Sequence, residues 1–165
     1  APYQGFRKIL LVTDGSPSSL NAARYLGKFP LPENVDIRVM HVLPPIQVPI
    51  MMEPSMGAWQ TVYAVYPTRE EEAIIRKRDA KFGEALLKRT SSLIQRHGIG
   101  ATPVLVRGDA ATEIMDYVKA EKMDLIVAGS RGLGNFKSIW VGSVSRKLVH
   151  YSDCSVLVVK GPGKA

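Results

Sequence analysis

The sequence predicts an α/β fold in which helices cover both faces of an open parallel sheet. Short, continuously apolar runs alternate with longer amphipathic stretches along the 165 residues, and such alternation is typical of a parallel sheet enclosed on both sides. Turn-forming, glycine-containing segments follow two of the apolar runs, after Val12 and after Ala128. No internal repeat or second-domain boundary is evident, so we expect residues 1–165 to form a single domain.

The first strand and helix follow from an apolar run and a capped turn. Ile9–Val12 is apolar throughout and predicts a buried strand. A helix is then expected over about Pro17–Lys28, because Ser16 suits the N-cap and Pro17 suits the first helical position.

A second strand, Val35–Val42, leads into a long proline-rich connection. The strand carries Asp36 and Arg38 on one face, so we expect it to be less enclosed than the first. Residues 44–68 hold five prolines and three methionines, which makes them too apolar for a solvated linker and too rich in proline for a regular element. We expect an ordered excursion that packs on the body of the protein or on a partner.

Four side chains of this excursion have large apolar surfaces, namely Met51, Met52, Met56 and Trp59. We expect them to cover the core; a contact surface or a lid over a binding site are the alternatives.

A long helix is expected over about Thr68–His97. Its apolar face is predicted from residues that recur at steps of seven and four: Ile75, Phe82, Leu86, Leu93 and His97. Gly98 is expected to end it.

The second half of the chain alternates in the same way. Ala101–Arg107 predicts a strand at a sheet edge, because Pro103 has no N–H for a second neighbour. Asp124–Ala128 and Ser155–Lys160 predict two more strands. The two helices between these strands each have an apolar stripe: Ala111, Ile114 and Val118 on the helix that opens at Gly108, and Val141, Val144, Leu148 and Tyr151 on the last one.

Charge and composition exclude several classes of function. The net charge of +7 favours anionic ligands, but no basic block is interleaved with aromatic residues, which disfavours nucleic-acid binding. The single cysteine, Cys154, excludes an internal disulfide and a cysteine-built zinc site. No apolar run is long enough to cross a membrane, and no secretory-signal pattern opens the chain, which predicts a cytoplasmic location.

The most informative motif is the glycine-rich loop that runs from Gly129 to Gly134. Nine residues separate Gly132 from Gly142-Ser143-Val144-Ser145. Glycines at a strand end let backbone N–H groups surround an anion, and a following helix start adds free donors and a partial positive charge. The loop therefore predicts a phosphate site. It matches neither the dinucleotide fingerprint nor the lysine-containing phosphate loop, and a flexible loop with incidental glycines remains the alternative.

These glycines resemble the ATP-binding signature of the universal stress proteins, in the pattern Gly129-x-x-Gly132, nine residues, Gly142-Ser143. The segments Ile9–Ser16, Asp124–Ala128 and Cys154–Val159 are also similar to that family. The resemblance covers nearly the whole chain, apart from the proline-rich excursion.

The resemblance implies a five-stranded parallel sheet in the order 3-2-1-4-5, with a Rossmann-like architecture similar to the adenine nucleotide alpha hydrolases. It further implies bound ATP or AMP, and a homodimer in which the last strands, Val156–Val159, meet across a two-fold axis. Such pairing would cover an apolar sheet edge. Coverage by the methionine-rich excursion is the alternative.

We expect the nucleotide to bind where the strand order reverses. The predicted binding residues are Val12, Thr13, Asp14, Val42, Ala128, Gly129, Ser130, Arg131, Gly132, Gly142, Ser143, Val144 and Ser145.

Their roles follow from position and, for Val42 and the adenine edge, from resemblance alone. Gly129 and Gly132 would let the ribose and α-phosphate approach, while Gly142, Ser143 and Ser145 would hold the outer phosphates. Arg131 is either a phosphate partner or a surface arginine.

Asp14 has two interpretations. It would bind a ligand group, either Mg²⁺ that bridges to the phosphates or a ribose hydroxyl, or it would cap the first helix together with Ser16.

We expect a stress protein that binds an adenine nucleotide and couples occupancy to conformation or partner contact. Efficient phosphoryl transfer needs a positioned base and transition-state cations, and neither is evident, so we expect no enzyme activity or slow hydrolysis at most. A slow Mg²⁺-dependent ATPase or nucleotidyl-transfer enzyme that uses Asp14, and a nucleotide-free dimeric scaffold, are the alternatives.

Overall fold

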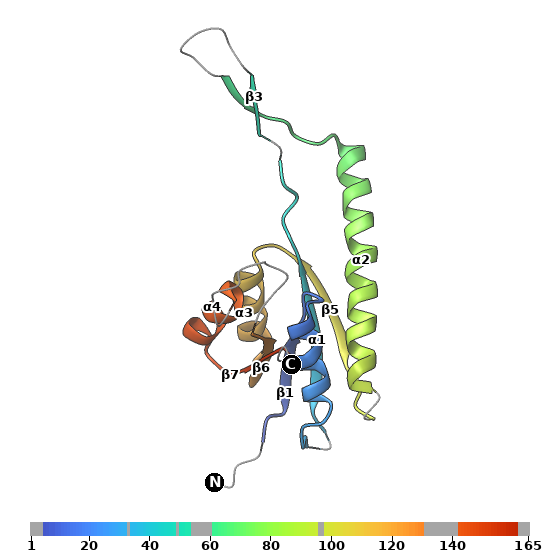
Figure 1. Ribbon diagram of the computed structural model, residues 1–165, viewed down its shortest axis with the longest axis vertical. Coiled ribbons are helices and arrows are strands. Elements are labelled where there is room, and N and C mark those ends of the chain that lie inside the picture. Colours follow the sequence, from blue (N-terminus) through green and yellow to red (C-terminus); the bar gives the residue numbers. More distant parts are fainter. Residues whose placement is uncertain are drawn as a thin grey trace.

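The computed structural model shows a five-stranded parallel sheet with helices on both faces (Figure 1). It describes residues 5–32, 34–48, 50–53, 61–95, 98–130 and 142–161. The elements in chain order are β1 (Lys8–Val12), α1 (Pro17–Leu26), β2 (Asp36–Leu43), β3 (Ile50–Glu53), β4 (Thr61–Ala64), α2 (Arg69–Gln95), β5 (Thr102–Arg107), α3 (Ala110–Glu121), β6 (Leu125–Gly129), α4 (Ser143–Tyr151) and β7 (Ser155–Val159).

The large sheet has the order β5-β2-β1-β6-β7, and all of its strands are parallel. These are the five strands that the sequence predicts, so the order 3-2-1-4-5 is confirmed. Pro103 lies in the edge strand β5, where its missing N–H costs no bond to an outer neighbour. The other edge is β7.

The core lies in two layers, one on each face of the sheet. Successive side chains of β1 alternate between them: Ile9 and Leu11 pack beneath α1 and α2, and Leu10 packs beneath α3 and α4. The predicted inner face of α3 is confirmed, since Ala111, Ile114 and Val118 are all buried.

The predicted stripe of the last helix is only partly confirmed. Leu148 is fully buried, but Tyr151 is 72% exposed. Tyr151 is the last residue of α4, and Val149 and His150 before it are exposed as well, so burial on this helix ends at Leu148. Val141 lies outside the described residues.

The excursion over residues 44–68 contains an antiparallel hairpin, which corrects the prediction that it lacks a regular element. β3 pairs with β4 in the register Ile50↔Ala64 to Glu53↔Thr61, and the two form a sheet of their own. No proline falls inside either strand, so the prolines flank the ladder and do not interrupt it.

Figure 1 shows β3 and β4 beyond the end of the large sheet, near the start of α2. Met51 and Met52 belong to β3, and the prediction that these methionines cover the core stays a prediction. The described strands of the hairpin pair with each other and not with β7. Met56 and Trp59 lie outside the described residues.

Helix α2 begins with a reciprocal cap and packs on the sheet only with its second half. Thr68 Oγ1 accepts a hydrogen bond from Glu71 N at 3.2 Å, and Thr68 N donates to Glu71 Oε2 at 2.8 Å. The buried residues of the helix begin at Gly83. Phe82, predicted on the inner face, is 62% exposed, because it comes just before the part of α2 that is buried. The first half of the helix extends beyond the sheet (Figure 1). His97 lies outside the described residues.

Candidate functional site

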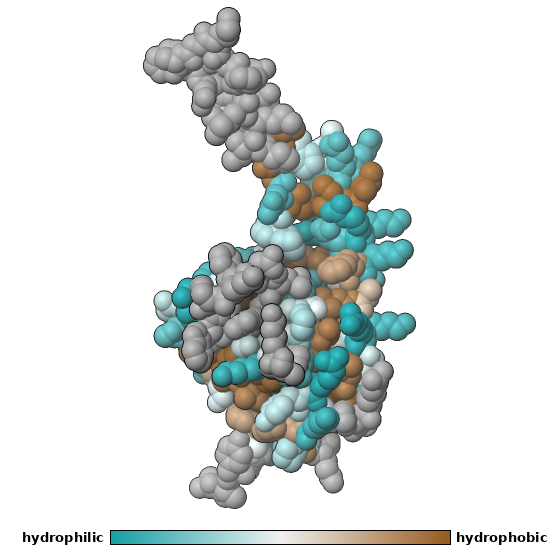
Figure 2. All heavy atoms as spheres, in the orientation of Figure 1, coloured by the Kyte–Doolittle hydropathy of each residue, from teal (hydrophilic) through white to brown (hydrophobic). Residues whose placement is uncertain are grey.

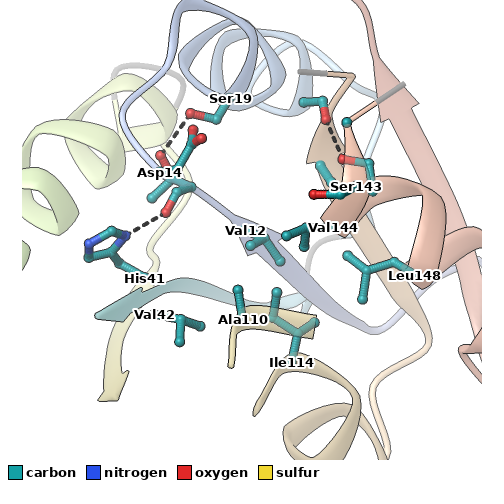
Figure 3. Close-up of a pocket in the computed structure, with 15 residues that line it drawn as sticks. Val12, Asp14, Ser19, His41, Val42, Ala110, Ile114, Ser143, Val144 and Leu148 are labelled. Atoms are coloured by element: carbon teal, nitrogen blue, oxygen red, sulfur yellow. Dashed lines mark hydrogen bonds between the residues drawn. The ribbon is translucent and has the colours of Figure 1, made fainter. Parts of the chain in front are cut away.

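A pocket with a cavity volume of about 140 Å³ opens at the carboxyl ends of β1, β2 and β6 (Figure 3). The chain passes from β1 to β2 on one side and later returns to β6 on the other, so the pocket lies where the strand order reverses. Its described lining consists of Val12, Thr13, Asp14, Ser19, His41, Val42, Ala110, Ile114, Ala128, Gly129, Gly142, Ser143, Val144, Ser145 and Leu148.

The lining divides into a polar part and an apolar part. Asp14 and Ser143 lie on opposite sides of the pocket in Figure 3, and Val12, Val42 and Ile114 line the space between and below them. A ligand with a flat apolar portion and a polar tail fits this division.

His41 ties the end of β2 to the loop after β1. Its Nδ1 lies 2.8 Å from the carbonyl oxygen of Thr13, and Thr13 N donates to Met40 O at 2.9 Å. Because a carbonyl oxygen only accepts, Nδ1 is the donor in this contact. The ring is 7% exposed and meets Phe82 edge-on, with centroids 6.3 Å apart.

Asp14 turns its carboxylate toward the start of α1. Its Oδ1 accepts a hydrogen bond from Ser16 N at 3.0 Å, and Ser16 Oγ in turn accepts one from Ser19 N at 3.2 Å as the N-cap of α1. The capping interpretation of Asp14 thus has direct geometric support. Within the part of the chain that the structure describes, no three His, Cys, Asp or Glu side chains gather as a metal would require.

The start of α4 forms one wall of the pocket. Gly142 is the N-cap, with φ −62° and ψ 158°, and as a glycine it has no side chain of its own that could cap the helix. Gly142 N donates to Ser130 O at 2.7 Å, and Ser145 Oγ donates to Gly129 O at 2.7 Å, so the helix start is fixed to the end of β6. The first amides of a helix have no intrahelical acceptor and carry a partial positive charge. This wall is therefore suited to an anion.

Gly129 lines the pocket, but α1 is what requires it to be a glycine. A Cβ at this position would lie 2.6 Å from Ser19 N and 2.7 Å from Ser18 Oγ. The end of β6 therefore touches the start of α1 at a distance that no side chain allows. This intramolecular contact is a reason for glycine beside the predicted one, room for a ribose and a phosphate, which stays a prediction.

Most of the sequence-predicted site residues come together in this pocket: Val12, Thr13, Asp14, Val42, Ala128, Gly129, Gly142, Ser143, Val144 and Ser145 line it. Ser130 is buried behind the lining, where its N donates to Val159 O at 2.8 Å. Arg131 and Gly132 lie outside the described residues.

Sequence reasoning missed five lining residues, namely Ser19, His41, Ala110, Ile114 and Leu148. Ile114 and Leu148 were assigned to the core, and the pocket opens where that core reaches the end of the sheet. A signal for His41 was present, because it is a polar residue next to the carboxyl end of an apolar strand.

Comparison with known proteins identifies the family. Residues 5–160 match the model of the universal stress protein family. The chain belongs to this family. The universal stress protein YxiE of Bacillus subtilis is 30% identical to it over 158 residues, which cover 94% of this chain and 99% of that protein.

Solved structures share the fold of this universal stress protein. A family member from Arabidopsis thaliana with AMP bound superposes with a TM-score of 0.63 at 22% identity, over 94% of this chain and 92% of that one. A universal stress protein in complex with cAMP gives a TM-score of 0.63 at 19% identity, over 96% and 100% of the two chains. Among the described helices, none has the length and apolar character of a membrane span.

Proposed function

We propose that this universal stress protein binds an adenine nucleotide, ATP or AMP, in the pocket between β1, β2, β6 and α4. The observation that carries the proposal is the start of α4, where the N-cap residue Gly142 offers no side chain of its own to the first turn at the wall of the pocket. Among the described lining residues the only formally charged group is Asp14, an anion. In that part of the lining, main-chain amides are the groups suited to phosphate.

The apolar part of the pocket is proposed to hold the nucleoside. Val12, Val42 and Ile114 offer surfaces for a base or a ribose, and Val42 stands at the end of β2, where backbone groups can meet the adenine edge. AMP and cAMP are bound in two proteins that share this fold, which supports a ligand of this chemical class.

Binding, and not turnover, is the proposed activity, with occupancy coupled to conformation or partner contact. The carboxylate of Asp14 already accepts from Ser16 N, and no lysine is found among the described lining residues. Phosphoryl transfer relies on a positioned nucleophile and on cations at the developing charge. A slow Mg²⁺-dependent ATPase is the second candidate, favoured by the position of Asp14 in the lining.

We also propose that β7 pairs with β7 of a second copy to form a homodimer. β7 is an edge strand with the apolar sequence Val156–Val159, and an uncovered edge of this kind invites pairing. Sedimentation equilibrium at micromolar concentration should give the dimer mass; a monomer mass would contradict this proposal without affecting the nucleotide site.

Isothermal titration calorimetry with ATP, AMP and GTP, each with and without Mg²⁺, tests the binding proposal. We expect saturable heats at one site per chain for ATP or AMP and weaker binding of GTP. Absence of heat for every nucleotide, together with an unchanged melting temperature at millimolar ligand, would overturn it. Measurement of phosphate release in the same samples separates binding from hydrolysis.

A further inference from the structure

The first half of α2 extends beyond the sheet as an exposed arm. Residues 69–82 include no buried side chain, and burial begins at Gly83. Figure 2 shows apolar surface among hydrophilic side chains along this part of the molecule. We call residues 69–82 the α2 arm.

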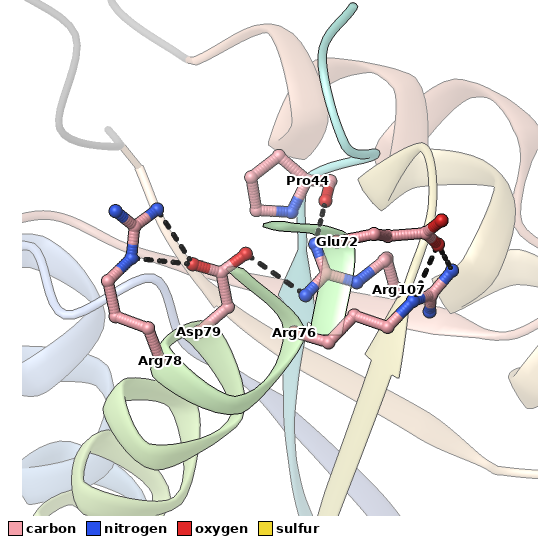
Figure 4. A network of polar contacts seen from close by, with 6 residues as sticks. All are labelled: Pro44, Glu72, Arg76, Arg78, Asp79 and Arg107. Atoms are coloured by element: carbon pink, nitrogen blue, oxygen red, sulfur yellow. Dashed lines mark hydrogen bonds and ion pairs between the residues drawn. The ribbon is translucent and has the colours of Figure 1, made fainter. Parts of the chain in front are cut away.

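The base of the α2 arm is held firmly to the sheet (Figure 4). Arg107, at the end of β5, donates through Nη2 to Asp79 Oδ2 at 3.0 Å and through Nη1 to Pro44 O at 2.7 Å. Both Arg107 and Asp79 side chains are largely shielded, at 18% and 20% exposure. The arm therefore projects in a fixed direction, which lowers the ordering cost of any contact it makes.

One exposed face of the arm has a symmetric arrangement of charge around an apolar centre. Ile74 is 68% exposed. Glu70 and Glu71 precede it by four and three residues, and Lys77 and Arg78 follow it by three and four, and all four are exposed. Residues at these spacings share a helix face. From the N-terminal to the C-terminal end of the arm, this face is therefore first acidic, then apolar at Ile74, then basic.

The existing contacts of these charges leave the pattern intact. Glu71 belongs to the cap with Thr68, and Arg78 contacts Asp79 at 3.3 Å while its side chain stays 76% exposed. The ion pair between Arg76 and Glu72 lies within the helix beside this face. Surface pairs of this kind are weak, so they compete little with a partner that presents opposite charges.

We propose that the α2 arm docks antiparallel against the α2 arm of a second copy of this chain. A two-fold axis through Ile74 places Glu70 of one copy opposite Arg78 of the other, and Glu71 opposite Lys77, on both sides of the axis. Such an interface is isologous, as a symmetric dimer requires. A parallel alignment would place like charges together, so the charge order selects the antiparallel pair.

This contact is a different surface from the β7 edge. α2 packs on β2 and β5, at the side of the sheet opposite β7. The pairing of two arms therefore adds an association step of its own, whether or not β7 pairs. Two aromatic residues near the ends of the arm, Tyr66 and Phe82, are 75% and 62% exposed.

Charge exchange between two variants tests the pairing. Glu70→Arg makes the face basic and Arg78→Glu makes it acidic, so each variant alone should associate about tenfold more weakly than the parent. An equimolar mixture should regain association, because the two faces then match. Lys88→Glu, an equal charge change on the same helix outside the arm, should behave as the parent does in sedimentation velocity over a concentration series.

A cross-link at the axis gives a second readout that does not depend on the β7 edge. In a Cys154→Ser background, Ile74→Cys should form a disulfide between identical positions of two chains much faster than Lys88→Cys does. Equal cross-linking rates, or variants whose association is unchanged, or a mixture that regains nothing, would each overturn the proposal.

Discussion

The imidazole of His41 and the carbonyl of Thr13 are joined by a buried hydrogen bond of 2.8 Å between Nδ1 and O. His41 lies near the end of β2 and Thr13 directly follows β1, so this bond adds a side-chain link between the two paired strands where they line the pocket. Asp14, the next residue, takes its position from the same loop.

Replacement of His41 by Phe should destabilise the protein and loosen the site. The carbonyl of Thr13 would lose its donor in a buried position, which costs about 2 kcal/mol of unfolding free energy. Urea denaturation measures that loss, and the affinity for AMP should fall with it. His41→Asn, which keeps an N–H near the position of Nδ1, should recover part of both. If His41→Phe proves as stable as the parent, this bond does not hold the loop.

Gly129→Ala should be strongly destabilising because its new Cβ would lie 2.6 Å from the backbone nitrogen of Ser19. Overpacking against backbone costs about 3 kcal/mol when the neighbour cannot move aside. The measurement is the midpoint of urea unfolding.

Gly100→Ala serves as the matched control for this substitution. Nothing lies within 4 Å of a Cβ at Gly100, so alanine there should be neutral or stabilise by up to about 1 kcal/mol. Equal effects of the two substitutions would show that β6 and α1 are not in close contact.

Asp79 should make the stability of the α2 arm depend on pH. The hydrogen bond from Arg107, followed by the contact with Arg78, lowers the pKa of the Asp79 carboxyl below its usual value. A carboxyl with a lowered folded-state pKa stabilises the protein above its unfolded-state pKa, and that stabilisation disappears as the pH falls through the folded-state pKa.

Comparison with Asp79→Asn isolates this effect. The parent should have a larger free energy of unfolding than the variant at pH 6. This difference should become smaller toward pH 3, where aspartate carboxyls become protonated. Paired urea titrations at the two pH values measure it. A difference that stays constant from pH 6 to pH 3 would mean that the Asp79 charge makes no contribution.

Asp14→Asn should separate the two interpretations of Asp14. Asparagine keeps an oxygen that can accept from Ser16 N, so the local turn should survive. If Asp14 binds Mg²⁺ at the phosphates, the affinity of the variant for Mg·ATP should be about tenfold or more lower than that of the parent. If Asp14 only caps α1, the affinity of the variant for ATP without Mg²⁺ should be higher than that of the parent, because a negative charge near the phosphates is removed. Calorimetry in the presence and absence of Mg²⁺ distinguishes these results.

The large sheet was predictable because its strands follow a local rule. Ile9–Val12 and Leu125–Ala128 are apolar at every position, as strands covered on both faces are, and Pro103 by itself places β5 at an edge. The meeting of the loops after Val12 and after Ala128 then followed from the topology of parallel sheets.

The parts that sequence reasoning missed depend on contacts between distant segments. The periodicity of α2 predicts one apolar face along its length, but only the sheet determines that packing begins at Gly83. The contact that requires glycine at position 129 was likewise missed, because nothing in the sequence shows that β6 ends against Ser18 and Ser19 of α1. The hairpin of β3 and β4 was missed because the number of prolines outweighed their positions outside the strands.

The central claim is that the main-chain amides at the start of α4 hold the phosphates, and removal of one amide tests it most directly. Ser143 is the first residue of α4, and Gly142 before it is extended, so proline fits at position 143 without breaking the helix. Ser143→Pro removes the amide hydrogen, whereas Ser143→Ala removes only the hydroxyl. Calorimetric titration with ATP should show affinity about tenfold or more lower for Ser143→Pro than for Ser143→Ala, in two variants of equal thermal stability. Equal ATP affinity in the two variants would contradict the claim.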